Sequence, residues 1–326
     1  MSQPAESAVS AVGPVSPESP ENTADSAALA RIYADIEKSA GLLDVPCERA
    51  KVWPILTAYE DKLARSVIAF RVATGARNAG DLDCRFTMFP ASTDPYAIAL
   101  ANDLTAKTDH PVGAFLGEIH RNFPIDTSGI DFGVVGGFKK TWSFFPADDL
   151  QGLAPLAELP SAPPALGENL DFFTRHGLHD RVSLVGIDYR HRTVNTYFAH
   201  APAECFQPEG MRTLLREIGL PEPSERLLRL GREAFGIYTT VGWDSRKIER
   251  ICFAVMTPDP FTLPVAIEPK IEHFLHHYPH DGDDRRSVYA ITSAPDGEYH
   301  KVQAYYQWRA QMLNVMLLSD SEEGGA

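Results

Sequence analysis

The sequence predicts an α+β fold in which a ten-stranded antiparallel β-barrel encloses a central lumen and a ring of helices surrounds it. Five segments have the pattern of paired strands, and the first strands of these pairs begin near residues 66, 131, 181, 234 and 285. Segments with helical periodicity fill the intervals between pairs. A sheet of ten strands is expected to close on itself, because closure removes its exposed edges.

The predicted elements follow in chain order. The strand pairs are 66–75 with 81–90, 131–137 with 140–146, 181–190 with 193–200, 234–243 with 247–256, and 285–295 with 298–308. Turn residues such as Pro295-Asp296-Gly297 join the two strands within a pair. The clearest helical patterns span 28–43, 94–104, 204–218 and 267–278.

The ends of the chain differ from this pattern. Residues 1–26 contain no Lys or Arg and are rich in Pro, Ser, Glu and Ala, so we expect a disordered tail and no secretory signal. Residues 27–318 are expected to form a single barrel domain. Residues 319–326 are expected to form an acidic disordered tail.

Charge and cysteine content limit the partners. The 30 Lys and Arg against 44 Asp and Glu give a net charge of −14, which disfavours nucleic acid and anionic membranes. No apolar run reaches the roughly 18 residues of a membrane-spanning helix. The four cysteines form no CxxC pair, which is typical of reduced thiols in a cytoplasmic protein. We expect a cytoplasmic monomer.

Alternation within the strands separates an apolar face from a polar one. Ile68, Phe70 and Val72 alternate with Ala69, Arg71 and Ala73, and the later strands repeat the pattern. If helices cover the apolar face, the polar face lines the lumen. The polar positions are Arg71, Asp83, Arg85, Lys140, Trp142, Thr193, Asn195, Tyr197, Tyr238, Arg250, Lys301, Gln303 and Tyr305.

Five of these polar positions are cationic in an acidic protein. Buried cations that converge need an anion, and a diphosphate suits Arg and Lys well. Aromatic faces beside them would stabilise a carbocation after diphosphate leaves. Alternation alone leaves open that several of these side chains form structural salt bridges or point outward.

Four motifs resemble the soluble bacterial aromatic prenyltransferases of the ABBA, or PT-barrel, family, including its phenazine prenyltransferases. The motifs are GGFKKTWSFFP (136–146), DYRHRTVNTYF (188–198), GWDSRKIERICFAV (242–255) and EYHKVQAYYQ (298–307). The resemblance implies a dimethylallyl transfer from dimethylallyl diphosphate to a carbon of an electron-rich acceptor in secondary metabolism. The acceptor could be a phenazine carboxylate, a hydroxynaphthalene or a phenolic acid.

The resemblance, taken with the lumen-facing cations, also implies roles for single residues. Diphosphate binding is expected of Lys140, Asn195, Arg250, Lys301, Tyr238, Thr193, Arg85 and Arg71. The shield around the prenyl cation is expected to be Trp142, Tyr197 and Tyr305. The acceptor pocket is expected to contain Ser183, Leu184, Phe235, Gln303 and Met312.

The metal requirement is where this chain departs from magnesium-using members of the family. Those members resemble it at Asp83 but have a small residue in place of Arg85. Because Arg85 can supply the positive charge of a metal, and Asp83 can pair with Arg85 or Arg71, we expect no essential cofactor. Mg²⁺ bound by Asp83 is the alternative.

Two further interpretations remain at this stage. A barrel with this lumen could bind a hydrophobic or phosphorylated ligand without catalysing a reaction. The histidines of HFLHHYPH (273–280) could bind a metal, but a solvated helix end is the interpretation we favour.

Overall fold

The computed structural model describes residues 20–75, 79–282, 285–309 and 311, and the side chains from residue 27 onward. Ten strands form a closed barrel in which each strand pairs with its neighbours in the chain, and β1 pairs with β10. Every pairing is antiparallel. The predicted ten-stranded antiparallel barrel is therefore confirmed.

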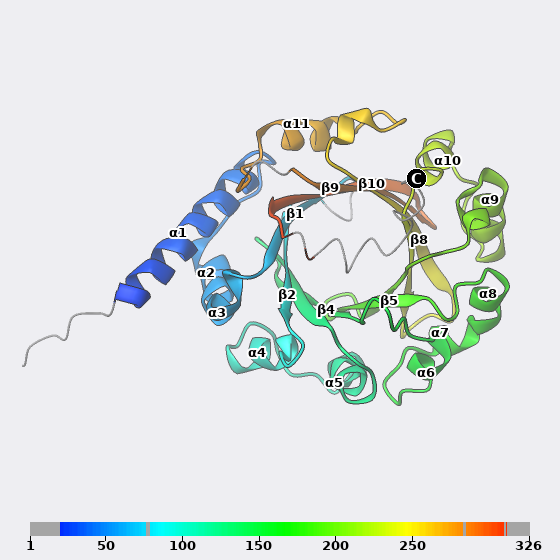
Figure 1. Cartoon of the computed structure of the whole chain (residues 1–326), viewed down its shortest axis with the longest axis horizontal. Helices are drawn as coiled ribbons and strands as arrows, with labels where there is room; N and C mark the ends of the chain where they lie inside the picture. Colours follow the sequence, from blue (N-terminus) through cyan, green and yellow to red (C-terminus); the bar gives the residue numbers. More distant parts are fainter. Residues whose placement is uncertain (1–19, 76–78, 283–284, 310, 312–326) are drawn as a thin grey trace, which may run out of the picture.

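The strands are β1 Val67–Ala73, β2 Asp83–Pro90, β3 Thr127–Gly133, β4 Gly137–Phe144, β5 Val182–Asp188, β6 Thr193–Phe198, β7 Gly236–Gly242, β8 Ile248–Thr257, β9 Ser287–Ala294 and β10 Gly297–Gln307. The helices are α1 Pro20–Gly41, α2 Arg49–Ala58, α3 Glu60–Leu63, α4 Pro95–Ala101, α5 Val112–Asn122, α6 Leu153–Ala157, α7 Pro164–Glu168, α8 Leu170–Arg175, α9 Pro208–Glu217, α10 Glu225–Gly231 and α11 Pro269–His277, with short 3-10 turns at Ala203–Phe206 and Pro260–Thr262. Figure 1 shows the helices arranged around the barrel.

The two ends of the barrel differ. The five short turns within strand pairs all lie at one end, which we call the hairpin end. The longer connections between pairs, which carry the helices, start and finish at the other end, which we call the helical end. The two ends of the lumen are therefore built from different kinds of connection.

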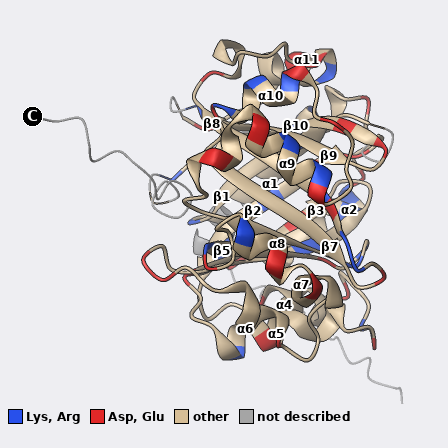
Figure 2. Ribbon diagram, turned by 90° about the vertical axis from the view of Figure 1, so that its right-hand side faces the viewer, with Lys and Arg blue, Asp and Glu red and all other residues tan. Residues whose placement is uncertain are grey.

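The alternation of the strands is confirmed by burial. Ile68, Phe70 and Val72 of β1 pack in the main hydrophobic core between barrel and helices. Inside the lumen, Trp142 and Tyr305 belong to a separate apolar cluster with Phe144. Figure 2 shows acidic and basic residues distributed over the helices that surround the barrel.

Two predicted boundaries are wrong. The second hairpin lies earlier than expected, because Thr127–Gly129, a polar segment that we assigned to no element, belongs to β3. A Cβ at Gly129 would collide with the backbone of β2, so glycine permits the close approach of the two strands there. At the N-terminus, α1 begins at Pro20, inside the expected tail of residues 1–26.

Other features of the chain match expectation or fall outside the described residues. All four cysteines are free, and Cys84, Cys205 and Cys252 are buried. No helix in the described part is long and apolar enough to cross a membrane. The acidic segment 319–326 lies outside the described residues.

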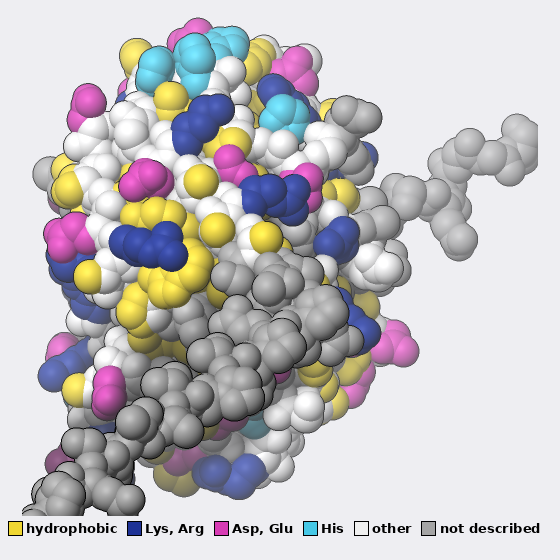
Figure 3. Space-filling view, turned by 90° about the vertical axis from the view of Figure 1, so that its left-hand side faces the viewer, with side chains coloured by type: hydrophobic (Ala, Val, Ile, Leu, Met, Phe, Trp, Pro, Cys, Tyr) yellow, Lys and Arg dark blue, Asp and Glu magenta, His cyan; other side chains and the backbone are white. Residues whose placement is uncertain are grey.

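The histidines of α11 gather on the surface, as the upper part of Figure 3 shows. His276 and its neighbour Glu272 are both about half exposed. Among the described residues, no group of three potential ligands is arranged to hold a metal ion. A solvated helix end is the interpretation that fits this geometry.

A buried histidine outside the lumen makes stability depend on pH. His300 contacts the hydroxyl of Tyr289 at 2.8 Å and lies 3.9 Å from Glu268, which pairs with Arg226. Burial, with repulsion from Arg226, lowers the pKa of His300 from 6.5 to about 4. Between these values the unfolded chain binds a proton that the folded chain does not, so stability falls as the pH falls.

We therefore expect the free energy of unfolding to lose about 3 kcal/mol between pH 6.5 and pH 4 through this one group. Urea unfolding across that range, compared with His300→Gln, isolates the contribution of the imidazole. His280→Gln, which alters an exposed histidine beside Arg285, serves as the control. Equal pH slopes in the wild type and His300→Gln would contradict the assignment.

Candidate active site

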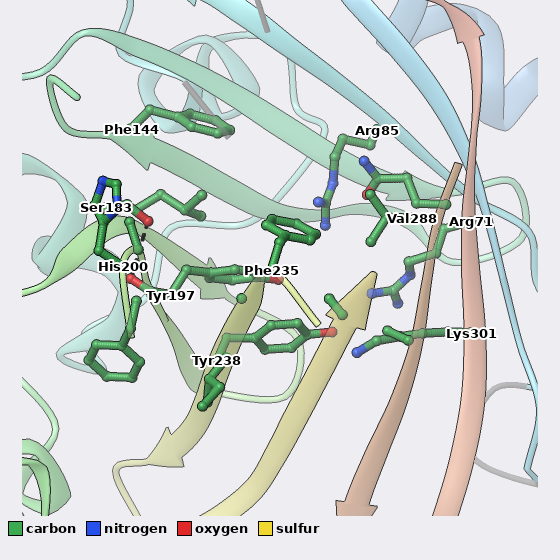
Figure 4. Close-up of a pocket in the computed structure, with 18 residues that line it drawn as sticks. Arg71, Arg85, Phe144, Ser183, Tyr197, His200, Phe235, Tyr238, Val288 and Lys301 are labelled. Atoms are coloured by element: carbon green, nitrogen blue, oxygen red, sulfur yellow. Dashed lines mark hydrogen bonds between the residues drawn. The ribbon is translucent and has the colours of Figure 1, made fainter. Parts of the chain in front are cut away.

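A cavity with about 920 Å³ of empty space, part of it open to solvent, occupies the lumen. We call it the central cavity. Its polar side carries Arg71, Arg85 and Lys301, and its opposite side, toward the helical end, is mainly apolar (Figure 4). The predicted residues that line it are Arg71, Arg85, Lys301, Tyr238, Tyr197, Ser183, Leu184, Phe235 and Gln303.

The remaining predicted residues lie around this cavity. Lys140, Thr193, Asn195, Arg250, Trp142 and Tyr305 are buried, and strand alternation places them on the same face as cavity-lining neighbours in β4, β6, β8 and β10. They do not themselves line the central cavity. Met312 lies outside the described residues.

Three aspartates neutralise most of the buried cations. Asp83 binds Arg71 and also accepts hydrogen bonds from Lys139 at 2.9 and 3.0 Å. Although burial opposes ionisation, Arg71 and Lys139 lower the pKa of Asp83 to about 2. The expectation that Asp83 pairs with Arg71 is confirmed, whereas Arg85 has a different partner.

Arg85 belongs to a rigid cluster with Asp131 and Trp142. Its guanidinium donates to both oxygens of Asp131, at 2.8 and 3.0 Å, and lies 3.9 Å above the Trp142 ring. Trp142 Nε1 donates to Asp131 at 2.8 Å. One face of this indole is therefore already occupied by a cation.

Lys140 has a partner of the same kind. Its ammonium lies 3.2 Å from Asp188, which also contacts the ring nitrogen Nδ1 of His191. Burial lowers the pKa of Lys140, and the attraction of Asp188 opposes that shift. The charge of Lys140 is thus largely balanced within the protein.

Lys301 has no such balance. It is 8% exposed, and no carboxylate among the described residues pairs with it. Its ammonium lies 4.3 Å from the centre of the Tyr238 ring. Burial, together with repulsion from Arg71, Lys140 and Arg85, holds the pKa of Lys301 well below its ordinary value. An anion bound beside Lys301 would raise this pKa again, so anion binding and protonation of Lys301 favour each other.

Further polar groups on the inner face of the barrel are suited to an anion. Arg250 is 7% exposed and has no carboxylate partner within the described part of the chain. Asn195 lies two strands away in the same row, and its oxygen accepts from Thr240 at 3.4 Å, which leaves its amide nitrogen for a ligand. The buried hydroxyl of Thr193 also has no hydrogen-bond partner among the residues that the structure describes. Each of these groups can donate a hydrogen bond to an oxyanion.

Aromatic rings lie next to this unbalanced charge. The rings of Tyr197 and Tyr238 stack with centroids 4.1 Å apart, and both line the central cavity. Trp142 packs edge-on against Tyr197 at 5.5 Å. Tyr305 accepts a hydrogen bond from Gln303 at 2.8 Å. Of the three residues expected to shield a cation, only Tyr197 lines the cavity, and Tyr238 takes the adjacent place.

The sequence analysis missed Lys139, Asp131 and Asp188. A bulge in the β3–β4 pair lets the consecutive residues Lys139 and Lys140 both reach carboxylates of the barrel interior. Alternation could have predicted that Asp131 and Asp188 face the lumen, because each follows an apolar residue in its strand. No comparable signal predicts Lys139, because a bulge cannot be inferred from alternation.

The family model that describes aromatic prenyltransferase Orf2 matches residues 27–316. The chain belongs to this family. A 5,10-dihydrophenazine-1-carboxylate 9-dimethylallyltransferase of Streptomyces anulatus is 55% identical over 91% of this chain and 99% of its own. A flaviolin linalyltransferase of Streptomyces virginiae is 50% identical over 87% of this chain and 94% of its own. A furaquinocin biosynthesis prenyltransferase of a Streptomyces strain is 51% identical over 86% of this chain and 91% of its own.

Membership of this family decides between the two functional interpretations. The chain is an aromatic prenyltransferase of secondary metabolism, and the alternative of a barrel that only binds a ligand is not supported. The lumen with converging cations and stacked tyrosines is the place where its geometry fits this chemistry.

Proposed function

We propose that this prenyltransferase moves a dimethylallyl group from dimethylallyl diphosphate to a carbon of an electron-rich aromatic acceptor. The observation that carries the proposal is the buried, unbalanced ammonium of Lys301 beside the stacked rings of Tyr238 and Tyr197. A phosphate group would neutralise the ammonium, and the rings would face the adjoining allyl carbon. We expect a monomeric cytoplasmic enzyme.

Polar side chains and aromatic rings would have different roles in the reaction. Lys301, Arg250, Asn195 and Thr193 would bind the diphosphate and stabilise the negative charge that grows as the allylic C–O bond breaks. The bonding electrons leave with the diphosphate oxygen. Tyr197 and Tyr238 would stabilise the allyl cation until a ring carbon of the acceptor attacks it. The ring proton would then pass to a weak base such as the released diphosphate or water, which restores the aromaticity of the acceptor.

We propose a five-carbon donor from the name of a relative and not from the central cavity, which Trp142 does not line. The position of Trp142 itself is fixed. Trp142 lies across from Gly186, where any Cβ would collide with the indole ring, and Asp131 fixes the indole nitrogen. The indole therefore occupies a fixed volume of the lumen beside Asn195. A relative at 55% identity is named as a dimethylallyltransferase, and its acceptor is a phenazine carboxylate. We place a phenazine carboxylate first among the acceptors, ahead of a hydroxynaphthalene or a phenolic acid.

Mass spectrometry of reaction mixtures tests the function. We would incubate the enzyme with dimethylallyl or geranyl diphosphate and each acceptor class. The proposal expects an acceptor that gains one C5H8 unit. A product that carries only C10H16 would contradict the donor assignment, and no product with any acceptor would contradict the function.

We also propose that no metal is required. Both oxygens of Asp83 face cations, since Arg71 and Lys139 bind them, so this carboxylate does not offer the free oxygens that Mg²⁺ prefers. Turnover in excess chelator is expected to equal turnover with Mg²⁺ within about twofold. Loss of activity in chelator, restored by Mg²⁺ and abolished again in Asp83→Asn, would instead make Asp83 a metal ligand.

A further inference from the structure

A second cavity, with about 830 Å³ of empty space that includes open solvent, lies at the hairpin end of the barrel. Its described lining comes from the β1–β2, β3–β4 and β5–β6 hairpins and includes Asp81, Asp83, Lys139, Arg190 and His191. Arg71 lines both this hairpin-end cavity and the central cavity. The two cavities therefore meet at a side chain in the interior of the barrel.

Polarity changes in one direction along the barrel. At the helical end the central cavity is lined mainly by apolar residues such as Phe144, Phe235 and Val288, with Ser183 and His200 as the polar exceptions and no Lys or Arg among the described residues. The described lining of the hairpin-end cavity contains the three cations Arg71, Lys139 and Arg190 against the two carboxylates of Asp81 and Asp83, together with His191. A charged group that crosses the apolar side must give up its hydration, whereas the hairpin end offers charged partners instead.

The carboxylates of the hairpin-end cavity do not oppose an anion strongly. Asp83 is neutralised by Arg71 and Lys139. Asp81 accepts hydrogen bonds from the backbone N–H groups of Leu82, Val135 and Gly136 at 3.0 to 3.3 Å.

Arg190 is the most exposed of the described cations that line this cavity. It is exposed, its guanidinium lies against Gly136, and within the described part of the chain it has no ion-pair partner. An anion that approaches from solvent would meet Arg190 first, and then Lys139 and Arg71.

We propose that the hairpin-end cavity is the passage for diphosphate groups. The prenyl diphosphate enters there with its hydrocarbon tail first, and inorganic diphosphate leaves by the same route. This order brings the tail to the tyrosine stack and leaves the charged group among the cations nearest the hairpin end. The aromatic acceptor and its product use the helical end. The inference rests on the proposed function, because it assumes a diphosphate donor.

Arg190→Gln tests the passage without disturbing a described ion pair. Arg192→Gln is the matched control. Arg192 lies on the same β5–β6 turn as Arg190 but does not line the hairpin-end cavity. Stopped-flow tryptophan fluorescence would follow the association of dimethylallyl S-thiolodiphosphate, an unreactive donor analogue, and of inorganic diphosphate. Because cations that steer an anion raise its association rate about tenfold or more, Arg190→Gln should slow association about tenfold and weaken its salt dependence.

Three results would confirm the route together. Association is slowed in Arg190→Gln and not in Arg192→Gln, single-turnover transfer from prebound donor is unchanged, and the acceptor KM is unchanged. Equal association rates in all three proteins would overturn the proposal. Ala199→Trp would narrow the central cavity at the helical end. If donor association is slower in this variant and unchanged in Arg190→Gln, the proposal is also overturned. The analogue binds whether or not an acceptor is known, so this failure differs from a failure of the proposed function.

Discussion

Lys301→Met is expected to lower kcat by about 10²- to 10³-fold, the usual loss when one group that stabilises transition-state charge is removed. The same substitution should leave the melting temperature unchanged or raise it. Lys301 is buried and has no carboxylate partner in the described part of the chain, so methionine in its place removes a group whose charge is costly to bury. Met also retains most of the side-chain volume.

Lys140→Met is the matched comparison, because it makes the same chemical change at a buried lysine that has a partner. It removes the cation 3.2 Å from Asp188 and leaves that buried carboxylate with His191 alone. We expect it to cost about 3 kcal/mol or more of folding stability. Thermal unfolding and steady-state kinetics of the two variants give the check. A destabilised Lys301→Met variant with near-normal turnover would contradict the role of Lys301.

Asp131→Asn is expected to cause the largest loss of stability, about 3–5 kcal/mol, because it leaves the Arg85 guanidinium buried without its carboxylate. Asp131 is 1% exposed and also accepts from the Trp142 indole. Activity should fall as well, since Arg85 and Trp142 both depend on this residue for their positions.

Urea unfolding measures the loss of stability in Asp131→Asn, and two further variants serve as controls. Asp126→Asn, one residue before β3 and without a described ion pair, should change stability by less than about 0.5 kcal/mol. The double variant Arg85→Met, Asp131→Asn removes both charges and should recover part of the lost stability. If the double variant loses as much unfolding free energy as the two single variants lose together, or more, the Arg85–Asp131 ion pair is not the cause of the destabilisation.

The barrel could be predicted because its two faces differ in chemistry at every second residue. Arg71 and Lys301 were placed in the lumen by alternation alone, and the structure lines the central cavity with both. The β3–β4 hairpin was misplaced by about four residues, since Thr127–Gly129 resembles a loop in composition. Strand composition cannot reveal that Gly129 is required by the close approach of β2.

The pairing of charges could not be predicted in the same way. Whether a lumen cation is neutralised depends on side-chain contacts across strands that are far apart in sequence, such as Arg85 with Asp131. The sequence therefore presents Arg85 and Lys301 as equivalent lumen cations. In the structure one is held by a carboxylate and an indole, and the other has no carboxylate partner among the described residues. This difference is what makes Lys301 the centre of the proposed diphosphate site.

A crystal structure of the enzyme with dimethylallyl S-thiolodiphosphate bound would test the central claim most directly. The account predicts that the phosphate oxygens lie within hydrogen-bond distance of Lys301 and Arg250, with the allyl carbon against the rings of Tyr197 and Tyr238. A diphosphate bound at Arg85 and Asp83 through a metal ion, with Lys301 not in contact, would contradict it.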